Sequence, residues 1–101
     1  MTEFEIYLPA VLDDGTPVDT AAIDGVKDIL SRTFGGYTHL RQRHEGVWSI
    51  GGVTFRDEIT IIRVLDDGTS AFDMSQFKRE LEASFQQQSI LIVRRQVDVI
   101  N

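Results

Sequence analysis

Hydrophobic and polar residues alternate along this chain with two different periods, and the period changes in a definite order. Alternation with period two predicts strands with one buried face, at 3–9, 37–50, 53–65 and 89–99. Apolar residues spaced three and four positions apart predict amphipathic helices, at 20–34 and 73–85. The predicted order of elements is therefore β-α-β-β-α-β.

A six-residue turn sequence divides the chain into two similar halves. Val-Leu-Asp-Asp-Gly-Thr occupies residues 11–16 and occurs again at 64–69. Asp and Gly supply the side-chain hydrogen bonds and the positive φ that tight turns need, and each copy lies between a predicted strand and a predicted helix. Two right-handed β-α-β units sharing one antiparallel sheet form the ferredoxin-like plait. We predict one α+β domain over residues 1–101, with a four-stranded antiparallel sheet and two helices on one face.

Turn and capping residues set the expected boundaries of these elements. Asp19 or Thr20 can cap the first helix and Asp73 the second, while Gly35-Gly36 suits a left-handed C-terminal cap. Gly51-Gly52 is typical of a two-residue hairpin, because both central positions of the favoured turn have positive φ.

Pairing across this hairpin gives an expected register. It places Trp48 opposite Phe55 and His44 opposite Ile59, with an irregular stretch near residues 44–46. Asp57 falls in phase with the apolar residues of the return strand, which predicts a bulge or a partly two-sided burial near residues 57–60.

Composition narrows the classes of function. With 42% hydrophobic and 26% charged residues, the chain is typical of a globular protein. Its net charge of -6 argues against binding to nucleic acid or anionic membranes, which requires a basic surface. No apolar run approaches the roughly 20 residues that span a bilayer, and the N-terminus lacks a secretory signal. We expect a cytoplasmic protein without membrane contact.

No residue pattern indicates a metal, a cofactor or a nucleophile. The chain contains no cysteine, and neither copy of the turn supplies the oxygen ligands of a calcium loop. His39 and His44 fall on opposite faces of a regular strand, and no serine lies in a Gly-x-Ser-x-Gly sequence. We therefore predict no catalytic residues, no metal site and no cofactor.

Several short motifs resemble those of an uncharacterised family of small ferredoxin-like proteins from bacteria and phages. They are Gly46-Val47-Trp48 with Gly51-Gly52, Arg56-Asp57-Glu58, Phe-Gly-Gly-Tyr-Thr at 34–38 and Phe-Gln-Gln-Gln-Ser-Ile-Leu at 85–91. The first strand departs from the bacterial pattern, because Tyr7-Leu8-Pro9 stands where Tyr-Phe-Gly is usual. The resemblance implies the fold and no activity.

The densest group of polar and aromatic residues gives a candidate ligand-binding site. Its members are Tyr7, Arg41, His44, Trp48 and Arg56. Arg56 can form a cross-strand ion pair with Glu45 or Glu58, or hold a small anionic ligand. Trp48 can anchor a core or an interface, or stack on a ligand.

Three function classes remain open, and the first is favoured. A non-enzymatic binding or regulatory module would self-associate, as a dimer or larger homo-oligomer, through an uncovered apolar sheet face or a strand edge, or bind another protein. That face would carry Ile62, Ile90 and Ile92. The alternative is a small α+β-barrel enzyme or ligand carrier, whose test is a concave cavity holding at least one histidine and one arginine. An RNA-binding sheet with exposed aromatic residues is the third.

Overall fold

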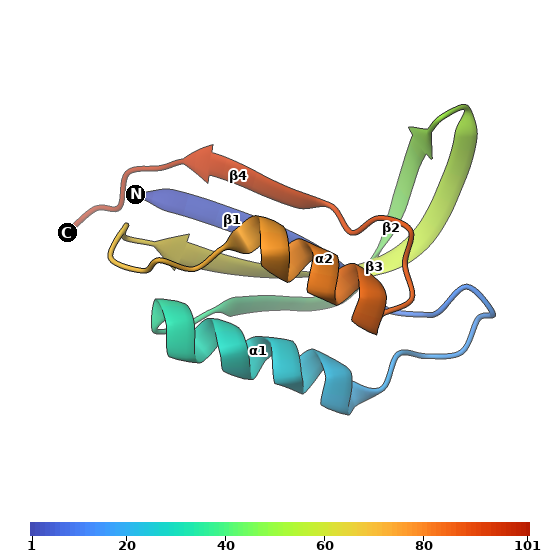
Figure 1. Cartoon of the computed structure of the whole chain (residues 1–101), viewed down its shortest axis with the longest axis horizontal. Helices are drawn as coiled ribbons and strands as arrows, with labels where there is room; N and C mark the ends of the chain where they lie inside the picture. Colours follow the sequence, from blue (N-terminus) through green and yellow to red (C-terminus); the bar gives the residue numbers. More distant parts are fainter.

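The computed structural model describes all residues, 1–101, and confirms the predicted order of elements. The elements are β1 (Thr2–Pro9), α1 (Thr20–Phe34), β2 (Thr38–Ile50), β3 (Val53–Asp66), α2 (Met74–Ser84) and β4 (Ile92–Gln96). The strands form one antiparallel sheet in the order β2-β3-β1-β4, and both helices lie on the same side of it (Figure 1). The fold is the α+β ferredoxin-like plait.

Capping and turn residues act where the sequence predicts them. Asp19 caps α1 by accepting a hydrogen bond from the Ala21 N–H, and Gly35 ends that helix with a φ of 85°. Asp73 caps α2 by accepting from the Gln76 N–H. Gly51 and Gly52 both have positive φ in the hairpin between β2 and β3.

The repeated hexapeptide forms the same local turn twice. In the first copy the Asp14 carboxylate accepts a hydrogen bond from the Thr16 N–H, at 2.9 Å. In the second, the Asp67 carboxylate accepts from the Thr69 N–H, at 3.0 Å. These are equivalent positions, so the Asp-Gly-Thr turn is a structural repeat, although the second copy begins inside β3 and the first lies wholly after β1.

The core lies between the helices and the sheet face that they cover. Apolar residues of β1 and β3 pack there against both helices; the cluster consists of Phe4, Ile6, Leu8, Ile23, Val26, Leu30, Ile62, Val64, Phe77, Leu81, Phe85 and Ile90. Burial of these side chains is the main source of stability in a chain without disulfides.

The expectation that Ile62, Ile90 and Ile92 face away from the helices is wrong. Ile62 is 0% exposed and Ile90 is 2% exposed, both within the core, and Ile92 packs against it. The reason is register: Ile62 and Ile92 both pair with Ile6, whose side chain faces the helices. Strands that are apolar on both faces do not reveal this phase in their sequence.

The hairpin register is confirmed from Ile50–Val53 to His44–Ile59. The irregularity lies at Thr60 of β3, within the predicted range, but at residues 41–43 of β2 and not at 44–46. Pairing shifts between Leu40 and His44, so that the extra residues belong to β2 and lie opposite Thr60 of β3. Beyond this bulge the hairpin turns away from the rest of the sheet (Figure 1).

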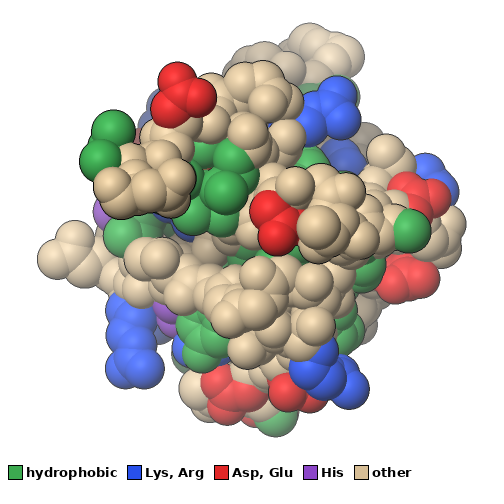
Figure 2. All heavy atoms as spheres, turned by 90° about the vertical axis from the view of Figure 1, so that its left-hand side faces the viewer, with side chains coloured by type: hydrophobic (Ala, Val, Ile, Leu, Met, Phe, Trp, Pro, Cys, Tyr) green, Lys and Arg blue, Asp and Glu red, His purple; other side chains and the backbone are tan.

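The two ends of the molecule differ. The termini lie together at one end, and Figure 2 shows acidic, basic and hydrophobic side chains interspersed there in small separate patches. The hairpin tip and the loop between β1 and α1 lie at the other end (Figure 1). Neither helix is long and apolar enough to cross a membrane.

Candidate functional site

The largest hollow, about 720 Å³, lies between the β2–β3 hairpin and the loop that follows β1. We call it the hairpin groove; it is lined by Val11, Leu12, Asp13, Gly15, Arg43, His44, Glu45, Thr54, Phe55, Arg56, Asp57 and Glu58. Its volume falls within the range of roughly 300 to 1,000 Å³ that is common for sites of small molecules. The groove contains a histidine and two arginines. A concave cavity with these residue types is what the hypothesis of an enzyme or ligand carrier requires.

Charged side chains of both signs line the hairpin groove. Arg43 pairs with Glu58 at 3.1 Å, and Arg56 pairs with Glu45 at 3.6 Å. All four side chains are more than half exposed, so these pairs contribute little to stability and can exchange for a ligand group. The groove can thus offer both a carboxylate and a guanidinium to a zwitterionic molecule.

Two polar groups of the groove, the His44 ring and the Asp57 carboxyl, lie in environments that are unfavourable to them. The Nε2 atom of His44 is buried and has no hydrogen-bond partner. Burial raises the pKa of the Asp57 carboxyl, and the nearby Asp13 carboxylate raises it further. Unpaired buried polar atoms and shifted carboxyl pKa values are common where a protein binds or transforms a ligand.

An aromatic floor adjoins the groove. Trp48 and Phe55 are cross-strand neighbours in the hairpin and line a smaller hollow of about 70 Å³. That hollow shares Asp13, Phe55 and Asp57 with the groove. A Cβ at Gly46 would lie 2.5 Å from the Trp48 ring, so the missing side chain leaves room for the indole.

The structure brings together only some of the predicted site residues. His44 and Arg56 line the groove, and Trp48 lines the adjoining hollow. Arg41 lines a different hollow, next to α1. Tyr7 lies on the open sheet face, where its hydroxyl donates to the Glu5 carboxylate at 2.9 Å.

Asp13 and Asp57 are groove residues that were not among the predicted ones. A signal for Asp57 existed, because it lies in phase with apolar residues of its strand. Asp13 gave no such signal, since it lies in a turn whose sequence explains its presence and only the fold brings it near the hairpin.

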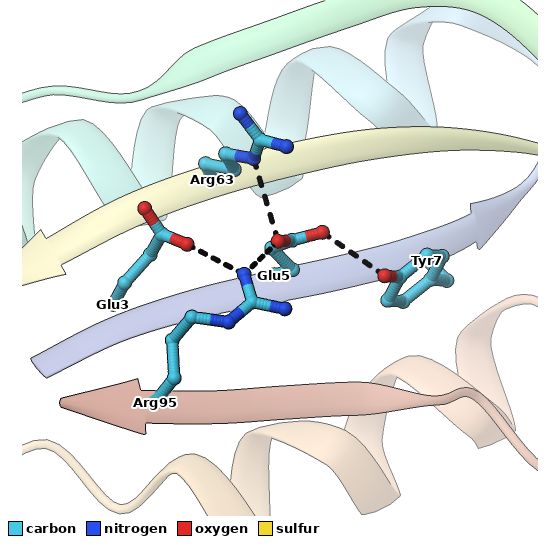
Figure 3. A network of polar contacts seen from close by, with 5 residues as sticks. All are labelled: Glu3, Glu5, Tyr7, Arg63 and Arg95. Carbon is cyan, nitrogen blue, oxygen red and sulfur yellow. Dashed lines mark hydrogen bonds and ion pairs between the residues drawn. The ribbon is translucent and has the colours of Figure 1, made fainter. Parts of the chain in front are cut away.

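A second cluster of polar side chains lies on the open sheet face, and its members bond to one another. The Glu5 side chain is 6% exposed and bonded by Tyr7 and Arg95, while the Arg63 Nε lies 3.5 Å from it (Figure 3). Arg95 also donates to Glu3 at 2.7 Å. Burial by itself would raise the pKa of Glu5, but the bonds from Arg95 and Tyr7 and the arginine charges outweigh it and lower that pKa. These groups satisfy one another, so this is a structural network.

Two solved structures share the fold of this chain. A phage SAM lyase in complex with S-methyl-5'-thioadenosine superposes with a TM-score of 0.61 at 15% identity, over 93% of this chain and 79% of that one. A phage SAM lyase in the apo state superposes with a TM-score of 0.62 at 18% identity, over 93% of this chain and 78% of that one. No protein-family model matches the chain, and neither does the sequence of any curated protein.

These comparisons correct the favoured function. Both solved structures that share the fold are structures of an enzyme, which contradicts the prediction of a non-enzymatic module. They favour the small-enzyme alternative. Their phage origin agrees with the phage part of the resemblance noted in the sequence, and what the chain shares with them is the fold.

Proposed function

We propose that this protein is a small phage-type enzyme that cleaves S-adenosylmethionine (SAM) and releases S-methyl-5'-thioadenosine. The observation that carries the proposal is the fold shared with phage SAM lyase over 93% of the chain. The hairpin groove is the proposed site.

The chemistry of SAM matches the groove group by group. SAM joins an adenosyl group to methionine through a positively charged sulfonium, and its amino-acid end carries an ammonium and a carboxylate. Trp48 and Phe55 would stack on the adenine, an interaction of about 1–3 kcal/mol per base. Asp57 and Asp13 would face the sulfonium, and Arg56 would pair with the substrate carboxylate.

The reaction removes a charge, which gives the groove a role in the rate. When the carbon–sulfur bond to the methionine chain breaks, its electron pair stays on sulfur, and the cation becomes a neutral thioether. If the bound substrate covers the groove, exclusion of water from the sulfonium lowers the barrier, because the charge is dispersed in the transition state. In the proposed elimination Asp57, whose pKa is raised, accepts the proton from the carbon next to the breaking bond. The electron pair of that carbon–hydrogen bond forms a carbon–carbon double bond, and the four-carbon chain leaves as an unsaturated amino acid.

The first experiment is release of S-methyl-5'-thioadenosine from SAM, followed by chromatography. We expect saturable, enzyme-dependent release, with boiled protein as the blank. A folded protein that binds SAM without cleaving it would be a carrier, and one that neither binds nor cleaves it would remove the proposal.

Three variants separate the proposed roles, because SAM is charged and its product S-methyl-5'-thioadenosine is neutral. Asp57→Asn and Arg56→Gln should each lower kcat/KM for SAM about tenfold or more and leave inhibition by the product nearly unchanged. Trp48→Ala should weaken both ligands, since both contain adenine.

The control is Arg32→Gln, an exposed arginine of α1 outside the groove, which should change neither quantity. Equal effects of Asp57→Asn on both ligands would place the sulfonium elsewhere.

A further inference from the structure

A second hollow, of about 350 Å³, lies between α1 and the bulged part of β2. We call it the α1 pocket. Its charged residues are Asp24 and Lys27 of α1 with Arg41 and Arg43 of β2, and His39 and Thr60 also line it. Only Arg43 lines the hairpin groove as well, so the two hollows are built from different residues.

His39 has one nitrogen engaged and one free. The Thr60 hydroxyl donates its single hydrogen to the Leu40 carbonyl, at 3.0 Å. The same oxygen lies 2.8 Å from the His39 Nε2 and must therefore accept from it. This fixes the proton on Nε2 and leaves Nδ1, which is buried, without a partner.

Positive charge in the α1 pocket is not balanced. No carboxylate lies within ion-pair distance of Arg41. The Lys27 side chain is only 14% exposed, and its ammonium is 3.9 Å from Asp24, at the limit of an ion pair. Arg43 is engaged by Glu58, outside the pocket. Two cations thus face one acid, in a protein whose net charge is -6.

The same imbalance acts on His39. Burial lowers the pKa of its ring, the charges of Lys27 and Arg41 lower it further, and Asp24 acts in the opposite direction. A bound anion would offset the part of this effect that comes from the two cations, because it would neutralise their charge.

We propose that the α1 pocket binds a small phosphate monoester, with Arg41 and Lys27 holding the phosphate next to the His39 ring. Arginine suits this role because its planar guanidinium can donate two hydrogen bonds to a phosphate. A water molecule occupies about 30 Å³, so a hollow of about 350 Å³ has room for the phosphate and a small organic group. The site does not depend on the proposed reaction in the hairpin groove.

The experiment uses the two histidines of the chain, His39 and His44, as a probe and its internal reference. The ring signals are followed by NMR while inorganic phosphate or glycerol 3-phosphate is added, against sodium chloride at equal ionic strength. We expect a saturable shift of the His39 ring and a rise in its pKa with both phosphates, tighter with glycerol 3-phosphate, and no matching change at His44.

Two variants test the assignment. Arg41→Gln should weaken phosphate binding about tenfold. Arg94→Gln removes another arginine without an ion pair, on β4 and outside the pocket, and should leave binding unchanged. The proposal is overturned if chloride reproduces the shift, if both histidines shift together, or if the two variants lose affinity equally. Tighter binding of free phosphate than of the ester would overturn the assignment of a monoester.

Discussion

At the scale of single residues, Glu5 shows how this sheet can hold a charged side chain in a buried position. Its side chain lies on the open face of β1, between an arginine of β3 and an arginine of β4, and is covered by them and by Tyr7 (Figure 3). A buried carboxylate is costly unless it is paired and hydrogen-bonded, and here every partner comes from a neighbouring strand or from two residues along the same one. The ionised form of Glu5 is thereby the stable one.

Replacing this carboxylate should weaken the fold in a pH-dependent way. We expect Glu5→Gln to lower the free energy of unfolding by about 1–3 kcal/mol at neutral pH, because two arginines lose the negative charge that they share and face an amide NH2 group instead. Since folding lowers the pKa of Glu5, its contribution is complete above the ordinary carboxyl pKa and is lost as the pH falls through the lowered value. Urea unfolding at several pH values should show the two proteins converging in acid.

The matched control is Asp28→Asn, which breaks the exposed ion pair with Arg32 on α1. Its effect should stay within about 0.5 kcal/mol. If Glu5→Gln cost no more than this control, the network would not stabilise the fold.

At the scale of elements, each helix and turn is fixed by a few local residues. Asp19 and Asp73 satisfy N–H groups at the starts of the two helices, and Gly35 supplies the left-handed conformation that ends the first. The bulge in β2 is the exception, because nothing local in its sequence sets it. It reorients the hairpin and so creates both the groove at its end and the α1 pocket at its edge.

The two glycines of the α1 region should respond in opposite ways to alanine. Gly25 is exposed inside the helix and a Cβ there would meet nothing within 4 Å, so Gly25→Ala should stabilise the protein by about 0.5–1 kcal/mol. Gly35 has a φ of 85°, and Gly35→Ala should destabilise it by about 1 kcal/mol. Thermal unfolding followed by circular dichroism measures both, and a loss of stability in Gly25→Ala would show that α1 is irregular at that turn.

At the scale of the whole molecule, the two faces of the sheet carry different kinds of side chain. The covered face holds the apolar core, and the open face carries the Glu5 network with half-buried aliphatic residues around it. Ile90 reaches the core although it precedes β4, because its N–H donates to the Glu82 carboxylate of α2 at 2.9 Å. The chain between α2 and β4 is thus held against the helix layer.

Truncating this residue tests the assignment of the two faces. Ile90→Ala should cost about 2–5 kcal/mol, because it leaves a cavity in the core. Its neighbour Leu91 is 47% exposed, and Leu91→Ala should cost less than about 1 kcal/mol. Chemical denaturation of the two variants gives the comparison, and the reverse order would mean that β4 presents its other face to the helices.

The features of this fold that depend on near neighbours in the chain could be predicted from the amino-acid sequence. The order of elements, and hence the plait, follows from local signals, because each of them rests on interactions within a few residues. These signals are the strand and helix periods, the caps at Asp19 and Asp73, the hairpin at Gly51-Gly52 and the repeated turn. The hairpin register followed as well, since a two-residue turn fixes it.

Packing between elements that are distant in the chain sets which sheet face the helices cover and which charged residues meet. Ile90 and Ile92 belong to a segment that is apolar on both faces, so pairing with β1 rather than pattern set their direction. Asp13 and Asp57 line the same groove, and Lys27 and Arg41 line the same pocket, because elements that are distant in the chain pack together there. Such contacts leave no periodic trace in a sequence, because they arise from how elements pack and not from how each one forms.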